Sequence, residues 1–399
     1  MPFFYGREYF ILRSGRAQML LEANRADLGP ALTYLLFDAA NPGESSQKSG
    51  ARNLAPASGF AYTGLSVVLG GHPFTALGHI TDTRWMVNEQ GVPSVEAAWW
   101  AGGVRVVEQF TACPDIGVFL RAIRLEGANL AGAEQVYLRL ELPSGARAEP
   151  PGLLFERSLS GHHIRLAIAA PGAPWRVTTE NVFEVGPLAV APGGSVAVNT
   201  VLAVDLDLAA RPDAAERAAG LTAAPAFAAA SAYWKTKSSL RTADRTVEDI
   251  FDKARFGLDG LVAPDGSMNA SLLEYGSQWV RDSSNTALGA IHAGHFEIAR
   301  AVLEKILTTM IGDEGLTMVN GGFEEPENEQ PDQMGELLHV LKAYRDWTGD
   351  DGLLRSHRGK LIPLIERPLL PMFRDGTDMF HNRREFWERR FDDGYELAY

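Results

Sequence analysis

The first half of the sequence alternates apolar and polar positions with a period of two. Residues 135–142 show it most clearly, because Val136, Leu138, Leu140 and Leu142 share one face while Tyr137, Arg139 and Glu141 share the other. Similar short runs follow at 104–111, 164–168 and 196–206, and Gly/Pro turns such as 143–145, 171–172 and 192–194 separate them. Many short alternating strands at this spacing predict an N-terminal antiparallel β-sandwich over residues 1–208.

The composition changes abruptly near residue 208. An Ala-rich stretch from Ala209 to Ala232, interrupted by Pro212 and Pro225, replaces the alternating valines and leucines. Alanine favours helix, and prolines end it. The stretch predicts a helical linker over residues 209–240.

Beyond Thr242 the apolar period becomes 3.6, which is typical of amphipathic helices. Apolar stripes predict helices that begin near Asp244, Thr286, Phe296, Met334 and Leu353, with breaks at Gly294 and Gly349 and interruptions at Pro363, Pro368 and Pro371. Short links between consecutive helices predict antiparallel pairs over residues 241–399.

Composition limits the classes of function. The 399 residues carry Lys+Arg 37 and Asp+Glu 50, a net charge of −13. An acidic surface repels phosphate backbones, so we expect no nucleic acid partner, whereas a neutral sugar is indifferent to the charge. The N-terminus lacks the pattern of a signal peptide, and no apolar run reaches the ~20 residues of a membrane helix. These features predict a cytoplasmic protein; oligomeric state is not indicated.

Metal and redox chemistry have little support in the sequence. Cys113 is the only cysteine and is interpreted as a small buried apolar residue. His162 and His163 lack a third ligand at metal spacing, so we expect no metal site and no cofactor. Trp85, Trp99 and Trp100 are interpreted as core or sheet-packing residues, with a sugar-stacking platform as the alternative.

The strongest concentration of chemistry lies in residues 264–288. Tyr275, Trp279, Arg281 and Asp282 directly precede an apolar helical pattern. A sugar suits such a set, because its C–H face packs on an indole while its hydroxyls bond a carboxylate and a guanidinium. The alternative is structural: a capping Asp and an ion-paired Arg at a helix start.

Two further segments could build a site around this cluster. The loop 321–334 is acidic and lies between predicted helices, so it is either part of a site or a solvated loop. Near the end of the chain, Trp387 and Glu388 are embedded among arginines. Those arginines favour structural ion pairing of Glu388 as the alternative to a catalytic role, since a nearby cation lowers a carboxyl pKa.

Taken with the sandwich and the paired helices, these segments resemble the glucoamylase and glucodextranase group of glycoside hydrolases. The resemblance rests on Asp-Gly-Ser-Met-x-Ala-Ser at 265–271, on Trp-x-Arg-Asp at 279–282 and on Trp387-Glu388. It implies an (α/α)6 toroid of six helix hairpins, in which Trp279, Arg281 and Asp282 line the subsite of the terminal sugar. It also implies that Glu388 is the general acid and that Tyr275 and Trp387 contact the substrate. Arg389 departs from the family pattern, which has a second Glu there.

A toroid of six hairpins needs twelve helices, whereas residues 241–399 predict about six, the last starting near Tyr395. We therefore expect the sequence to be a C-terminally truncated form that contains the N-terminal half of the barrel and lacks the general base. The reaction expected of the complete enzyme is exo-acting, inverting hydrolysis of α-glucosidic linkages in an oligosaccharide. The alternatives are a glycoside phosphorylase of similar architecture and a non-catalytic carbohydrate-binding protein.

Overall fold

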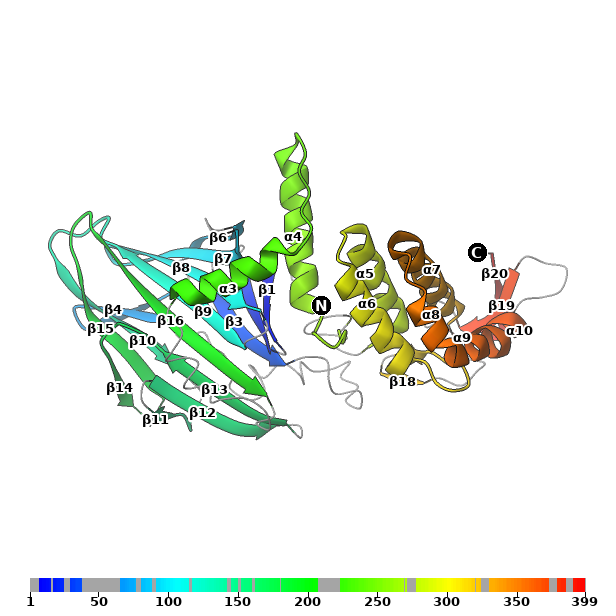
Figure 1. Cartoon of the computed structure of the whole chain (residues 1–399). Helices are drawn as coiled ribbons and strands as arrows, with labels where there is room; N and C mark the ends of the chain where they lie inside the picture. Colours follow the sequence, from blue (N-terminus) through cyan, green and yellow to red (C-terminus); the bar gives the residue numbers. More distant parts are fainter. Residues whose placement is uncertain are drawn as a thin grey trace. The chain divides into compact units, whose positions relative to one another are not determined.

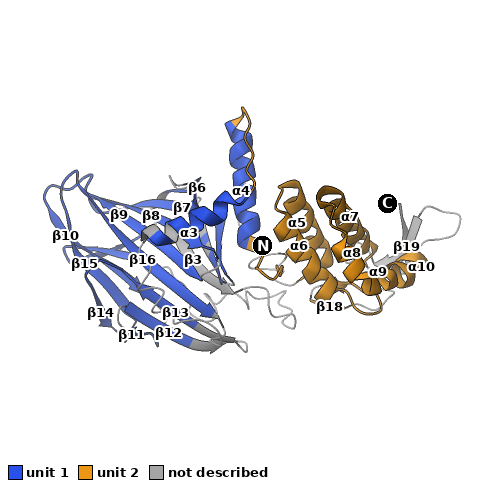
Figure 2. Cartoon of the chain, viewed as in Figure 1, with its two compact units in different colours: residues 1–37, 53–237, 245–260 blue, residues 38–52, 238–244, 261–399 orange. Residues whose placement is uncertain are grey.

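A computed structural model describes most of the chain (Figure 1). The described residues are 7–15, 17–24, 29–37, 65–76, 80–87, 91–114, 117–141, 145–149, 152–159, 162–179, 181–206, 223–268, 270, 278–319, 321–323, 330–372, 379–384 and 390–398. They form two compact units (Figure 2). Unit 1 comprises residues 1–37, 53–237 and 245–260, and unit 2 comprises residues 38–52, 238–244 and 261–399.

Unit 1 is built from antiparallel sheets of three, five and eight strands. The three-stranded sheet has the order β1 (Arg7–Ser14), β2 (Ala17–Asn24), β3 (Gly29–Phe37). The five-stranded sheet has the order β14 (Trp175–Thr179), β15 (Val182–Val190), β10 (Glu134–Glu141), β4 (Ser66–Leu69), β5 (His72–Thr75). The eight-stranded sheet has the order β11 (Arg147–Glu149), β12 (Gly152–Leu159), β13 (His162–Ala169), β16 (Ser195–Leu206), β9 (Val118–Glu126), β8 (Val104–Cys113), β7 (Pro93–Ala101), β6 (Ile80–Val87).

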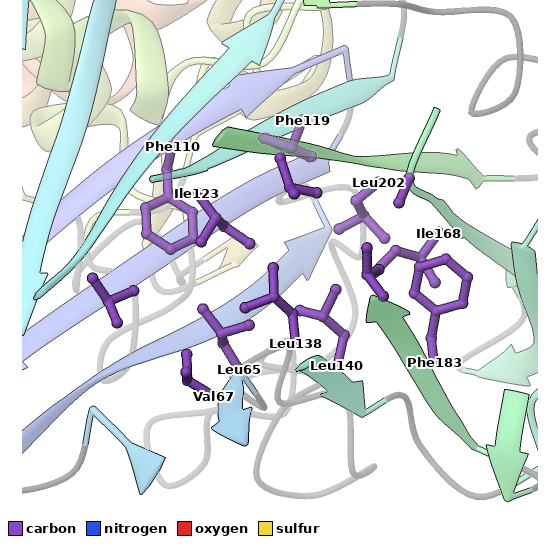
Figure 3. Close-up of a cluster of buried hydrophobic side chains, with 14 of the residues drawn as sticks. Leu65, Val67, Phe110, Phe119, Ile123, Leu138, Leu140, Ile168, Phe183 and Leu202 are labelled. Atoms are coloured by element: carbon purple, nitrogen blue, oxygen red, sulfur yellow. The ribbon is translucent and has the colours of Figure 1, made fainter. Parts of the chain in front are cut away.

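The two larger sheets share one hydrophobic core, which confirms the predicted sandwich. Val136, Leu138 and Leu140 of β10, all at most 1 % exposed, pack into a cluster with Phe110 and Ile123 of the eight-stranded sheet (Figure 3). The period-two pattern thus places alternate residues of β10 in the core, as expected for a strand with one buried face. Phe119 belongs to this cluster, whereas its neighbour Leu120 lies in a second cluster with Cys113.

The larger sheet is therefore buried on parts of both faces. Helices α3 (Ala223–Lys235) and α4 (Arg245–Leu261) add the third cluster of unit 1, in which Trp234 and Phe256 pack with Val92 and Trp85. Side chains of Arg13 and Gln18 donate to the carbonyl oxygen of Gly260 at the end of α4, at 3.1 and 2.7 Å. These bonds satisfy an acceptor that the helix end would otherwise leave open.

Several residues highlighted by the sequence are structural parts of unit 1. Cys113 is fully buried, and burial raises the pKa of its thiol to about 12, so it behaves as the apolar residue that was predicted. Trp99 is also fully buried and donates from Nε1 to Glu108 at 2.6 Å. Trp85 packs against Phe256 with ring centroids 5.4 Å apart. For Trp85 and Trp99 the packing interpretation is confirmed.

Unit 2 contains the paired helices. Its elements are α5 (Val280–His292), α6 (Phe296–Lys305), the π-helical turn η1 (Ile306–Met310), β17 (Met318–Val319), β18 (Gly322–Phe323), α7 (Pro331–Thr348), α8 (Gly352–Ser356), α9 (Arg358–Leu364), the π-helical turn η3 (Ile365–Leu369), α10 (Leu370–Met372), β19 (Met379–Arg384) and β20 (Arg390–Ala398). Helices α5, α6 and α7 pack on one another (Figure 1).

The predicted helix breaks are confirmed. Gly294, at φ 75°, makes the short turn between α5 and α6, and Gly349, at φ 72°, ends α7 in the left-handed conformation that suits glycine. The stripe on α6 and η1 is buried: Ala299, Leu303 and Ile306 are each 0 % exposed. A closed (α/α)6 toroid remains a prediction.

The predicted helix near Tyr395 is wrong. Residues 390–398 form strand β20, which pairs antiparallel with β19 so that Asn382 lies opposite Tyr395. The sequence agrees with a strand at this end, because Tyr395 and Leu397 alternate with Gly394, Glu396 and Ala398. The five-residue tail was too short for a helical period to be distinguished from this alternation.

The division into units is not identical to the predicted domains. Helix α4 lies inside the predicted helical domain of residues 241–399, but it groups with the sheets in unit 1. Domain boundaries near residues 208 and 240 remain a prediction. None of the described helices has both the length and the apolar character needed to cross a membrane.

Candidate functional site

The Trp-x-Arg-Asp segment opens helix α5. Trp279 is the residue before the helix, with an extended backbone at φ −127° and ψ 139°, and Arg281 and Asp282 lie in the first turn. A carboxylate in this turn is favoured by the positive end of the helix dipole. Trp279 is only 5 % exposed, so little of its indole is accessible.

A second helix start faces this one. Helix α7 begins at Pro331, and Gln330 before it has an extended backbone at φ −101° and ψ 104°. Proline suits the first helical position, because the nitrogen there has no partner in the helix in any case. Gln330, Asp332 and Gln333 are all buried, with 0, 7 and 0 % of their surface exposed.

Arg281 joins the two helix starts. Its Nη1 donates to Gln330 Oε1 at 2.8 Å and to Asp332 Oδ2 at 2.8 Å. The backbone N–H of Arg281 donates to Gln333 Oε1 at 3.2 Å. We call Arg281, Gln330, Asp332 and Gln333 the Arg281 cluster. With the Arg281 and Asp332 side chains 13 % and 7 % exposed, this is a largely desolvated ion pair.

The contact repeats one turn further along both helices. Asn285 Nδ2 of α5 donates to Glu336 Oε2 of α7 at 3.1 Å. Asn285 lies four residues after Arg281, and Glu336 lies four residues after Asp332. Both contacts therefore join residues that are 51 apart in sequence. A constant offset means that α5 and α7 run in the same direction in this region, with their N-termini at one end.

The small hairpin β17–β18 closes the cluster from a third element. Gln333 Nε2 donates to Thr317 Oγ1 at 3.4 Å, and Thr317 is fully buried next to β17. The backbone N–H of Gly321 donates to the carbonyl oxygen of Gln278 at 3.0 Å. The hairpin thus holds residues just before α5 and within the first turn of α7.

Glu336 has an unusual electrostatic environment. Burial raises the pKa of its carboxyl, and the negative charges of Asp332 and Asp282 raise it further, whereas the hydrogen bond from Asn285 and the charge of Arg281 oppose these effects. Carboxyl groups that retain a proton closer to neutral pH are common in sites that bind or transform polar ligands. The negative charges of Asp282 and Asp332 therefore both act on Glu336.

The Asp-Gly-Ser part of the resemblance is a structural turn. Asp265 Oδ1 accepts from the Ser267 backbone N–H at 3.0 Å, and Asp265 Oδ2 accepts from Lys305 Nζ of α6 at 3.0 Å. Burial alone would raise the pKa of Asp265, but hydrogen bonds from Ser267 and Lys305 lower it overall. Gly266 adopts φ +81° and lies so close to α6 that a Cβ would come 2.0 Å from the Ala301 carbonyl oxygen. The turn anchors this segment on α6.

The structure thus brings together part of the predicted site. Trp279, Arg281 and Asp282 share the start of α5. Of the structural alternative, the ion-paired Arg281 is observed, whereas the cap residue is Trp279 and not an Asp. Tyr275, Trp387 and Glu388 lie outside the described residues, as do residues 324–329 of the acidic loop. Their roles remain predictions.

Sequence analysis placed Gln330, Asp332 and Gln333 in the loop 321–334, which it considered either part of a site or a solvated loop, and it did not single out Glu336. All four residues contact α5. The available signal was the proline at 331 followed by an acidic residue, a pattern that favours a helix start. Among the described residues no group of three or more His, Cys, Asp or Glu side chains is suited to hold a metal ion.

Comparison with known proteins identifies the fold. No protein-family model and no curated protein sequence matches this chain. A protein from the human microbiome, assigned provisionally as a kojibiose phosphorylase, aligns with a TM-score of 0.57 and 10 % identity over 86 % of this chain and 54 % of its own. A bacterial glucoamylase solved in complex with acarbose aligns with a TM-score of 0.56 and 12 % identity over 96 % of this chain and 61 % of its own. The chain thus spans a little over half the length of each, and it shares with both a fold that combines antiparallel sheets with packed helices.

Proposed function

We propose that this chain belongs to a carbohydrate-active enzyme that binds a neutral oligosaccharide at the starts of α5 and α7. The observation that carries the proposal is the convergence of Arg281 and Asp282 with Asp332 and Glu336 in one partly desolvated place. Rigid helices hold these groups, as is common in binding sites that need fixed geometry. Two solved structures of the same fold, a provisionally assigned kojibiose phosphorylase and a glucoamylase, act on sugars by their names.

The charges of the site favour a neutral ligand. Three carboxyl groups disfavour phosphate, sulfate and carboxylate ligands through like-charge repulsion. Arg281 offsets one of these negative charges, and among the described residues no group of carboxylates is suited to hold a metal ion. A hydroxyl both donates and accepts, so a sugar can bond the carboxylates and the amides together.

The reaction that we propose is exo-acting, inverting hydrolysis of α-glucosidic linkages. In this mechanism one carboxylic acid protonates the leaving oxygen and a carboxylate activates water from the opposite face. Glu388 is the proposed general acid, and no residue is assigned as general base. Trp279, Arg281 and Asp282, with Tyr275 and Trp387, are the proposed contacts to the sugar.

Phosphorolysis is the second candidate, and the provisionally assigned kojibiose phosphorylase of the same fold favours considering it. A phosphorylase uses phosphate in place of the activated water and releases a sugar phosphate. Phosphate would need its own cationic pocket, since the acidic groups around Arg281 repel it. A non-catalytic carbohydrate-binding protein is the third candidate.

The test combines binding with turnover. Calorimetry with maltose, isomaltose and kojibiose measures binding, and each sugar is then incubated with and without phosphate while glucose and sugar phosphate are quantified. Hydrolysis with release of the inverted anomer, seen by NMR, supports the hydrolase. Phosphate-dependent cleavage supports the phosphorylase. Binding without turnover supports the sugar site itself, since no general base is assigned in this chain, and it agrees with a non-catalytic binding protein as well. Absence of binding to all three sugars contradicts the proposal.

Asp282→Ala is the matching variant. In a catalytically active form of the protein we expect it to reduce turnover by orders of magnitude, because a carboxylate that binds hydroxyls of the reacting sugar acts most strongly in the transition state. Asp346→Asn, on the exposed surface of α7, is the control. A near-normal rate for Asp282→Ala would remove this residue from the site.

A further inference from the structure

Two buried polar atoms in the Arg281 cluster have no hydrogen-bond partner among the described residues. They are Gln330 Nε2 and Asp332 Oδ1. Their residues are 0 and 7 % exposed, so neither atom is satisfied by bulk solvent. Buried polar groups are nearly always paired, so a donor and an acceptor that both lack a described partner in one cluster need an explanation.

The orientation of the Gln330 amide follows from its neighbour. A guanidinium can only donate hydrogen bonds, so the Gln330 atom that lies 2.8 Å from Arg281 Nη1 must be the oxygen. The amide nitrogen is then directed away from Arg281. In the same way Asp332 uses Oδ2 for Arg281, which leaves Oδ1 as the second acceptor.

The two atoms together select the chemistry of a ligand. An amide N–H donor rejects a cation, and a carboxylate oxygen rejects an anion. A pair of neighbouring hydroxyl groups meets both, because one hydroxyl accepts from Gln330 Nε2 while the other donates to Asp332 Oδ1. Both side chains are bonded to the same Nη1 of Arg281, so Arg281 of α5 holds them at one place at the start of α7.

We propose that Gln330 Nε2 and Asp332 Oδ1 hold adjacent hydroxyl groups of the bound sugar and determine its specificity by rejecting sugars that lack either one. This inference rests on the proposed function and adds two residues that the family resemblance does not assign. A site built around a hydroxyl discriminates strongly against the deoxy analogue, because its buried groups are then left unpaired. One unpaired buried group corresponds to about 5- to 150-fold in affinity.

The first experiment needs no variant. Calorimetry measures the binding of methyl α-D-glucoside and of its 2-, 3-, 4- and 6-deoxy derivatives to the 399-residue protein. We expect two adjacent positions to account for the discrimination, each weakening binding by about 10-fold or more. Equal affinities across the series would overturn the inference and leave the proposed function standing. No binding of the parent glucoside or of the disaccharides would refute the proposed function and this inference with it.

Variants then assign the two hydroxyls. Gln330→Glu retains the oxygen that faces Arg281 and replaces the Nε2 donor with an acceptor. Asp332→Asn also retains the oxygen that faces Arg281, but it replaces the Oδ1 acceptor with a donor. Each should abolish discrimination at one of the two positions while discrimination at the other remains. Gln109→Glu is the matched control, because Gln109 Nε2 of β8 in unit 1 is likewise buried without a described partner. Thermal melting verifies folding, and wild-type discrimination in both cluster variants would overturn the assignment.

Discussion

Replacing Asp332 with asparagine should destabilise the packing of α5 against α7. The substitution conserves shape but removes the charge that faces Arg281 at 2.8 Å, in a pair whose side chains are 13 % and 7 % exposed. Breaking a buried ion pair by removing one partner costs about 3–5 kcal/mol, because the other charge stays buried without compensation. Arg281 retains its bond to Gln330 and a weaker one to the new amide oxygen, so the lower limit of about 3 kcal/mol applies here.

Hydrogen exchange measured by mass spectrometry tests this prediction locally, which matters because two compact units need not unfold in one step. A loss of about 3 kcal/mol corresponds to roughly 100-fold faster exchange of the amides in residues 280–292 and 331–348, if they exchange through the opening of this packing. Amides of the sandwich should keep their wild-type rates.

The control is Asp346→Asn on the same helix. Asp346 pairs with Lys342, but their side chains are 45 % and 72 % exposed, so water already screens the pair. Exchange should not change. A second test is the double variant Arg281→Leu with Asp332→Leu, which removes both charges and should recover part of the loss, because Gln330 Oε1 then loses its donor. Exchange in Asp332→Asn within about threefold of wild type would refute the reasoning, since the penalty for an isolated buried charge would then be absent.

Three further predictions concern stability. Gly266→Ala should lower the stability of unit 2 by about 3 kcal/mol or more in thermal melting, because the backbone has φ +81° and the new Cβ would lie 2.0 Å from a carbonyl oxygen. Gly349→Ala is the control: its φ is +72° but no atom lies within 4 Å of the new Cβ, so it should cost only about 1 kcal/mol. Glu336→Gln should stabilise the protein at pH 7, because a carboxyl group whose pKa is raised in the folded state opposes folding once it is ionised. This gain in stability should vanish below pH ~4, where the carboxyl group is protonated in both states. A gain that increases as the pH falls would contradict the prediction. Glu108→Gln should destabilise unit 1 by about 3–5 kcal/mol, because buried Arg121 loses the carboxylate that faces it. Glu108→Gln/Arg121→Met, which keeps a side-chain oxygen for Trp99 Nε1, is the compensated control in chemical denaturation.

Local patterns were sufficient to predict the sandwich. Residues 134–141 alternate in the sequence and in the structure, because a strand with one buried face has no other way to place its side chains. The helix over residues 296–310 was equally readable, since its apolar stripe is buried at every fourth or third position. In both cases the signal lies within one element.

The site was harder, because its contacts join residues about 50 apart. Nothing in the local sequence pairs Arg281 with Gln330 or Asp332, whose contacts span 49 and 51 positions. The start of α7 was also predicted three residues late, at Met334, since glutamine is not a preferred residue before a helix. Asp332 and Gln333 therefore seemed to belong to the acidic loop, although they are buried in the first turn.

The structure also changes what the family resemblance can mean for Arg281. The resemblance predicts that this arginine binds the terminal sugar, but its Nη1 already donates to two oxygens of α7. An arginine Nη carries only two hydrogens, so Nη1 has none left for a ligand. Any direct contact to a sugar must use the other side of the guanidinium, and the main effect of Arg281 is then to fix the directions of Gln330 and Asp332. The Asn285–Glu336 contact, one turn further along, keeps the two helices in the register that this requires. Specificity would thus be determined on α7, by residues that Arg281 holds in place from α5.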